Sequence, residues 1–191
     1  LEQYRKILKL FPRYAHTDKV LCFLGHEYQE LGMTPEMLQT YDRLITKFPK
    51  SRLVPEVLLI LGNFHLDKQD LAAAEKHYRQ AVRRSDPGIA ALARYRLGWL
   101  AMNRADYEDA LAEFTAAARA AGPGAITTTN ATPAQLEKIR NVRREALTDS
   151  VQAFTETHDP EEAARFYGNL ADTRTLYVAI LEKLGRRYVV Q

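Results

Sequence analysis

Residues 91–119 read ALARYRLGWLAMNRADYEDALAEFTAAAR, and this stretch decides the fold of the 191-residue chain. Apolar residues recur at helical spacing before and after the turn at residues 103–106, which predicts two amphipathic helices packed as a hairpin. A glycine inside a helix costs about 1 kcal/mol relative to alanine. Gly98 therefore predicts a point where the second helix approaches closely, with Ala110 as the small residue opposite and Phe114 in the seam.

The same pattern recurs twice upstream of this stretch. The positions at the same offsets are Leu24, Gly25, Met37 and Tyr41 in one copy, and Leu61, Gly62, Ala74 and Tyr78 in the next. From glycine to glycine the copies are 37 and 36 residues apart. Because a single helix pair cannot bury its apolar side, stacked copies are needed to build a core.

The recurring leucine-glycine pair, followed by a small residue and then an aromatic one, resembles the tetratricopeptide repeat, a 34-residue helix pair. The resemblance implies an all-α fold, a right-handed superhelical solenoid of antiparallel helix pairs with about ten helices. Residues 1–121 are predicted to form a regular array of a half repeat plus three repeats. Residues 122–132 are predicted to be a loop insertion, and residues 133–191 a degenerate repeat followed by the first helix of a truncated repeat.

The two ends of the chain interrupt the repeat pattern. The chain begins without Met inside one repeat and stops after a first helix, so we expect a fragment of a longer protein. We also expect the last helix to expose an apolar strip that allows end-to-end self-association. The strip consists of Ile180, Leu181, Leu184 and Tyr188.

Composition limits the classes of function. With 46% hydrophobic and 27% charged residues, the chain can bury an extended core. A net charge of +3 makes nucleic acid an improbable partner, because such proteins usually carry a larger basic excess. The single cysteine excludes an internal disulfide, and no apolar run is long enough for a transmembrane segment.

Catalytic and cofactor motifs are absent from the sequence. His26 and Glu27 lack the second histidine of a zinc-protease helix, and no phosphate-binding loop or nucleophile elbow is present. We therefore expect no enzyme, no cofactor and no metal site. Two alternatives stay open: a helical repeat protein that contacts RNA through residues 138–144, and the recognition arm of a larger multidomain enzyme.

The resemblance implies that the first helix of each repeat lines a concave groove that binds a protein or peptide. In the family, the contacts lie at the second, fifth, ninth, twelfth and thirteenth positions when the glycine is the eighth. The partner-binding residues implied for this chain are Lys19, His26, Glu30, Leu59, Asn63, Leu66, Tyr95, Trp99 and Met102. The alternative is that the helix after Pro133, or the loop at residues 122–132, folds back and fills this groove. A clamp for acidic C-terminal tails is not expected, because Cys22 and His26 replace the lysine and asparagine that it requires.

A narrower resemblance concerns the K-F-P-K-S turn at residues 47–51 between two long repeats. It is similar to bacterial cell-envelope tetratricopeptide proteins of the outer-membrane assembly lipoprotein and cell-division coordinator type. The wider pattern is also similar to gliding-motility envelope proteins of myxobacteria. The resemblance implies a non-catalytic scaffold in an envelope complex, periplasmic or membrane-associated, with a cytoplasmic location as the alternative.

Overall fold

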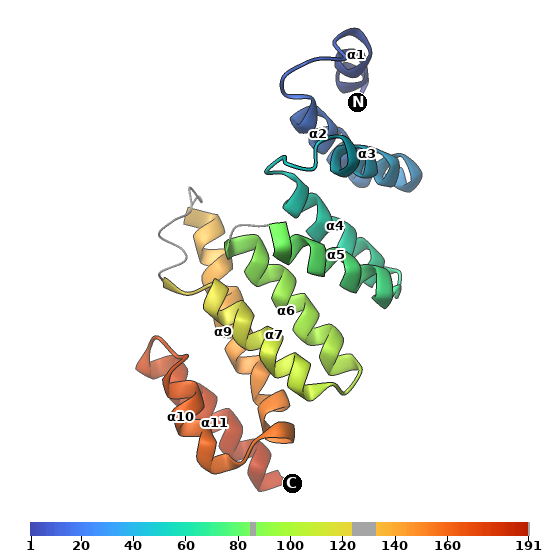
Figure 1. Ribbon diagram of the computed structural model, residues 1–191. Coiled ribbons are helices and arrows are strands. Elements are labelled where there is room, and N and C mark those ends of the chain that lie inside the picture. The colour runs from blue at the N-terminus through green and yellow to red at the C-terminus, as the bar shows by residue number, and fades with distance from the viewer. Residues whose placement is uncertain (85–86, 124–132, 191) are drawn as a thin grey trace.

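The computed structural model describes residues 1–84, 87–123 and 133–190 (Figure 1). These residues form ten α-helices, one short 3-10 helix and no strand, which confirms the predicted all-α fold. The predicted loop insertion at 122–132 lies, from residue 124 on, outside the described residues. The elements are α1 (Glu2–Leu10), α2 (Thr17–Glu30), α3 (Thr34–Lys47), α4 (Val54–Asp67), α5 (Leu71–Arg84), α6 (Pro87–Asn103), α7 (Tyr107–Ala120), α9 (Pro133–Thr157), η1 (Pro160–Glu162), α10 (Ala163–Gly168) and α11 (Arg174–Val190).

The helices are arranged as pairs that follow one another from the N-terminus to the C-terminus (Figure 1). The pairs are α2 with α3, α4 with α5, and α6 with α7. The second helix of a pair also packs against the first helix of the next pair, as α5 does against α6 and α7 against α9. Each pair thus covers the apolar side of its neighbour, as expected for stacked repeats.

A glycine and an aromatic ring meet where the two helices of each regular repeat cross. A Cβ atom added at Gly25, Gly62 or Gly98 would lie 2.6 Å from ring atom Cδ1 of the aromatic residue sixteen positions later. These rings belong to Tyr41, Tyr78 and Phe114, and all three are fully buried. The predicted close approach is therefore correct. Its partner at Gly98 is the ring of Phe114 rather than the small Ala110.

The turn between the two helices of a repeat has the same backbone geometry in all three copies. Its left-handed residue lies seven positions after the glycine and is Gly32 (φ 67°), Gln69 (φ 61°) or Ala105 (φ 56°). Only glycine adopts this conformation without steric cost. The same tight turn is therefore imposed on two residues that disfavour it, because the packed helices on either side determine the path of the chain.

The K-F-P-K-S turn joins two neighbouring repeats through its serine. The backbone N–H of Ser51 donates to the carbonyl oxygen of Phe48 at 2.9 Å. The Ser51 hydroxyl donates to Oδ2 of Asp18 at 2.6 Å, and this hydrogen bond lowers the pKa of the Asp18 carboxyl. The serine of the motif thus ties α2 to the start of α4, which is a packing role.

The fourth repeat departs from the pattern at the glycine position. Val151 replaces glycine in α9, although Tyr167 still lies sixteen residues later and is fully buried. The Tyr167 hydroxyl lies 3.0 Å from that of Ser150. The second helix of this repeat, α10, has only six residues. The degenerate repeat therefore keeps the aromatic residue but loses the close glycine crossing.

The last helix does not expose the apolar strip that the sequence predicted. Ile180 and Leu184 are 0% and 3% exposed, and they belong to a buried cluster shared with α7, α9 and α10. The Tyr188 hydroxyl donates to the carbonyl oxygen of His158 at 3.0 Å. The prediction was wrong because α11 already packs its apolar side onto α9 and α10, inside the same chain.

The glycine crossing gives a direct test of the packing. Gly62→Ala should lower the free energy of unfolding by about 1 to 2 kcal/mol, because overpacking costs more than the helix propensity of alanine returns. Gly185→Ala is the matched control, since Gly185 also lies within a helix but has no atom within 4 Å of an added Cβ. It should keep or raise stability. Urea unfolding followed by circular dichroism measures both, and equal stability of Gly62→Ala and wild type would contradict the crossing.

Candidate functional site

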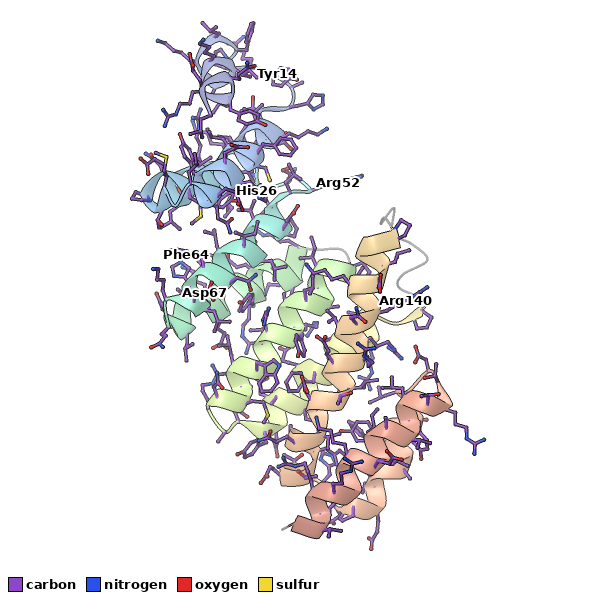
Figure 2. The ribbon with its side chains drawn as sticks, turned by 180° about the vertical axis from the view of Figure 1, so that it is seen from behind. Tyr14, His26, Arg52, Phe64, Asp67 and Arg140 are labelled. Carbon is purple, nitrogen blue, oxygen red and sulfur yellow. The ribbon has the colours of Figure 1, made fainter. Side chains whose placement is uncertain are left out.

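The face predicted to bind a partner lies on the first helices α2, α4 and α6. Figure 2 views the molecule from behind and labels His26 on α2, and Phe64 and Asp67 on α4. Of the nine predicted residues, Lys19, Glu30 and Trp99 are exposed and the others are half-buried: His26, Leu59, Asn63, Leu66, Tyr95 and Met102. All nine therefore remain accessible at least in part.

Trp99 is the most exposed aromatic side chain on α6. It is 38% exposed, and its ring meets that of Phe114 edge to face, with centroids 5.8 Å apart and an interplanar angle of 82°. Phe114 is itself fully buried. The core thus supports the indole on one side, and part of the ring stays open to solvent. A rigid aromatic ring of this kind is a typical anchor for a protein partner.

Tyr95 was predicted as a partner of Trp99 in the groove, but the structure uses it differently. Its hydroxyl donates to Oδ2 of Asp149 on α9 at 2.8 Å. Its ring lies 5.8 Å from that of Phe114. Burial raises the pKa of Tyr95 to about 12, so the hydroxyl stays protonated and remains a donor at neutral pH. Tyr95 therefore joins the third repeat to the fourth.

Helix α9 also borders the groove beside Tyr95. A hollow of about 460 Å³ separates the first half of α9 from α6. It is lined by Leu92, Tyr95 and Arg96 on α6 and by Glu137, Lys138, Asn141, Val142 and Glu145 on α9. Helix α9 thus packs beside the N-terminal half of α6 without filling the space between them, and Trp99 stays exposed.

Two polar side chains on the groove face are bound to tyrosines of the second helices. The Tyr78 hydroxyl donates to Oδ1 of Asn63 at 2.8 Å, and the Tyr41 hydroxyl reaches Oε1 of Gln29 at 3.5 Å. Burial raises the pKa of Tyr78 to about 12 and also raises that of Tyr41. Asn63 is therefore held in one orientation, with its amide nitrogen left for other contacts.

The N-terminal part of the groove is polar. The imidazole of His26 meets the Tyr41 ring edge to face at 6.0 Å, while Lys19 and Glu30 extend into solvent from opposite ends of α2. The apolar part begins with Leu59 and Leu66 on α4, which pack on the first core cluster. The predicted groove residues are thus polar on α2 and mainly apolar or aromatic on α6.

Comparison with known families agrees with this geometry. The family profile of the tetratricopeptide repeat-like domain matches residues 26–125, more than half of the chain. The chain belongs to the tetratricopeptide repeat-like domain family. No curated protein compared with the chain matches it. Repeat domains of this family are typically non-catalytic and bind other proteins.

The single cysteine of this tetratricopeptide repeat-like domain is buried in the core. Cys22 is 3% exposed, and burial together with the nearby Glu56 and Asp18 raises the pKa of its thiol to about 11. A thiol of this kind is not a nucleophile at neutral pH. Within residues 1–84, 87–123 and 133–190, no three His, Cys, Asp or Glu side chains gather to hold a metal ion. No helix of these segments is long and apolar enough to cross a membrane.

The basic stretch at residues 138–144 does not form one face of the domain. Arg143 points into the protein, where Nε lies 3.2 Å from Oδ2 of Asp172 and Nη2 donates to the carbonyl oxygen of Leu170 at 2.6 Å. Lys138 lines the hollow beside α6, and Arg140 is exposed (Figure 2). Since Arg143 is committed to packing, the stretch offers less positive charge than its sequence suggests.

Asp149 and Arg143 have structural roles that their local sequence does not indicate. Asp149 lies two residues before Val151, so an alignment of α9 with the earlier first helices places it beside the groove. The pairing of Arg143 with Asp172 spans 29 residues and leaves no local signal. Arg143 and Asp172 come together only because α9 packs against the region of α10 and α11.

Removal of the Tyr95 hydroxyl tests whether this residue has a packing role. Tyr95→Phe removes the bond to Asp149 and should lower the free energy of unfolding by about 1 kcal/mol, since Asp149 keeps Lys183 at 3.6 Å. Tyr14→Phe is the control, because Tyr14 is 46% exposed and no described residue bonds its hydroxyl. Hydrogen exchange should become faster in α9 for the first variant only. An unchanged exchange rate in α9 would show that the bond between Tyr95 and Asp149 does not stabilise the contact between the third and fourth repeats.

Proposed function

We propose that this domain is a non-catalytic scaffold that binds an amphipathic segment of a partner protein along its concave groove. The exposed ring of Trp99, fixed against Phe114, is the observation that carries the proposal. A preorganised aromatic side chain loses little conformational entropy when a partner covers it. Less of the favourable contact energy is therefore offset, and binding is tighter than for a mobile side chain.

The neighbouring groove residues define the kind of segment that binds. Leu59, Leu66 and Met102 are half-buried, so each offers part of an apolar side chain to a partner. Apolar side chains of the partner cover this region, and polar ones lie over Lys19 and Glu30. The change from polar to apolar surface along the groove fixes the direction in which the segment lies.

We further propose that the scaffold works in a bacterial cell-envelope complex, such as one for outer-membrane assembly or gliding motility. The K-F-P-K-S turn and the long repeats support this location, although Ser51 of the turn also has a packing role. Fractionation of the source cells, with the native protein detected by antibody, tests the location. Recovery from the cytosol alone would favour the cytoplasmic alternative.

Replacement of the anchor tests the groove. Trp99→Ala should weaken binding of the partner segment by about 2 kcal/mol, roughly thirtyfold in Kd. Leu71→Ala is the matched control, because Leu71 is also 38% exposed but lies on the second helix α5. Photo-crosslinking from position 103 identifies the bound segment, and titration of the purified segment then measures the Kd of each variant.

The outcomes separate the proposed function from its alternatives. Equal Kd values for wild type and Trp99→Ala, with weaker binding by Leu71→Ala, would place the site outside the groove. Capture of RNA with an affinity that falls steeply with salt would support the nucleic-acid alternative. We do not expect RNA binding, because Arg143 is already paired with Asp172. A catalytic domain in the full-length reading frame would support the recognition-arm alternative.

End-to-end self-association is a separate part of the proposal. The described part of the last helix leaves Val178 and Val189 as its exposed large apolar residues, at 43% and 86%. So little apolar surface supports only weak pairing. Light scattering should therefore give the monomer mass at micromolar concentration, with an increase only at much higher concentration. A stable dimer at micromolar concentration would show a further interface.

A further inference from the structure

A second hollow, of about 630 Å³, lies between α1 and α3 with α2 as its floor. Its floor residues are Leu21, Leu24 and Tyr28. At 100° per residue, these three lie on the opposite side of α2 from Lys19 and His26. The hollow is therefore on the other face of the array from the concave groove. We name it the basic cleft; its walls are Arg5, Leu8 and Lys9 on α1, and Gln39, Thr40, Asp42, Arg43, Thr46 and Lys47 on α3.

The charges of the basic cleft are strongly unequal. Four cationic side chains line it, against the single carboxylate of Asp42. Arg5 is fixed, because its Nε donates to the Tyr28 hydroxyl at 2.8 Å and its guanidinium lies over the Tyr28 ring. Lys9, Arg43 and Lys47 form no ion pair with any residue that the structure describes. The described residues thus leave the cleft with an excess of positive charge.

The equivalent place further along the array shows the opposite arrangement. Between α5 and α7, Arg79 lies 2.9 Å from Glu75, 3.5 Å from Asp109 and 3.4 Å from Glu113. Arg94 also reaches Glu113 at 2.9 Å. There the neighbouring helices supply the carboxylates. Between α1 and α3 the described helices contribute only Asp42, which leaves an excess of positive charge at the walls of the cleft.

We propose that the basic cleft docks an acidic amphipathic segment of a partner protein, independently of the concave groove. An apolar side chain of the segment covers the half-buried Leu8 of the α1 wall and the small exposed parts of Leu21 and Leu24 on the floor. Its carboxylates pair with Lys9 on one wall and with Arg43 and Lys47 on the other. Charge complementarity of this kind sets the orientation of a bound segment and speeds its association.

The dimensions of the cleft suit a peptide segment. The wall residues of α3 recur from Gln39 to Lys47 with helical spacing, which covers about 12 Å at 1.5 Å per residue. This length matches about two turns of a bound helix. The apolar floor and the charged walls together suit a ligand that carries an apolar side chain between carboxylates. A free anion has no such side chain.

The test uses a short fluorescein-labelled helical peptide made of glutamate and leucine, with a lysine and leucine peptide as the opposite-charge probe. Fluorescence anisotropy should show saturable binding of the acidic peptide only. Arg43→Glu with Lys47→Glu should weaken this binding about tenfold or more. Arg83→Glu with Arg84→Glu is the matched control, since both residues are exposed at the end of α5 and the net charge changes equally. The control should keep the wild-type Kd.

The remaining outcomes decide between this site and others. Trp99→Ala should leave the peptide Kd unchanged, which keeps the result separate from the groove proposal. Equal weakening by both charge-reversal pairs would overturn the proposal, because net charge alone would then explain binding. Tighter binding of anionic phospholipid vesicles than of the peptide, lost with Arg43→Glu and Lys47→Glu, would assign the cleft to a membrane surface. A concentration-dependent dimer abolished by the same pair would assign it to a second copy of the chain.

Discussion

The array depends on one steric constraint, the contact between a helix glycine and an aromatic ring of the next helix. At Gly25, Gly62 and Gly98 there is no room for a methyl group against the ring. The helices can therefore approach closely enough to bury the ring completely, and this burial fixes their crossing. Where Val151 replaces the glycine, the second helix is reduced to the six residues of α10. The regular geometry of the first three repeats is lost at that point.

The buried rings also connect the core to the surface. The hydroxyl of Tyr78 donates to Asn63 on the first helix of the pair and orients it. The ring of Phe114 supports the exposed ring of Trp99. The residue types at the crossing therefore decide which groove side chains are rigid. A tyrosine gives an oriented polar group at the groove, while phenylalanine leaves a purely apolar support. The choice of tyrosine or phenylalanine at the crossing therefore helps to set which parts of the proposed binding groove are polar and which are aromatic.

The two faces of the array differ in how their charges are satisfied. Between α5 and α7, arginines and carboxylates neutralise one another and join two repeats. Between α1 and α3, the cations of the basic cleft have no such partners among the described residues. In the proposed arrangement, the groove and the cleft lie on opposite sides of α2. We therefore propose that the scaffold holds two partner segments at once without competition between them.

The sequence by itself determined the helix pairs, their order and the close crossings, because these depend on local periodicity and on glycine at fixed offsets. The resemblance to the repeat family, rather than local periodicity, predicted that Lys19, Leu66 and Trp99 line one groove, because they lie on three different helices. Only the tertiary structure decided that α9 takes the hydroxyl of Tyr95 and that α11 buries Ile180 and Leu184. It alone showed that the cations of α1 and α3 meet over the floor of α2. These contacts join residues far apart in the chain, and their partners are chosen by how whole helices pack, which no local pattern records.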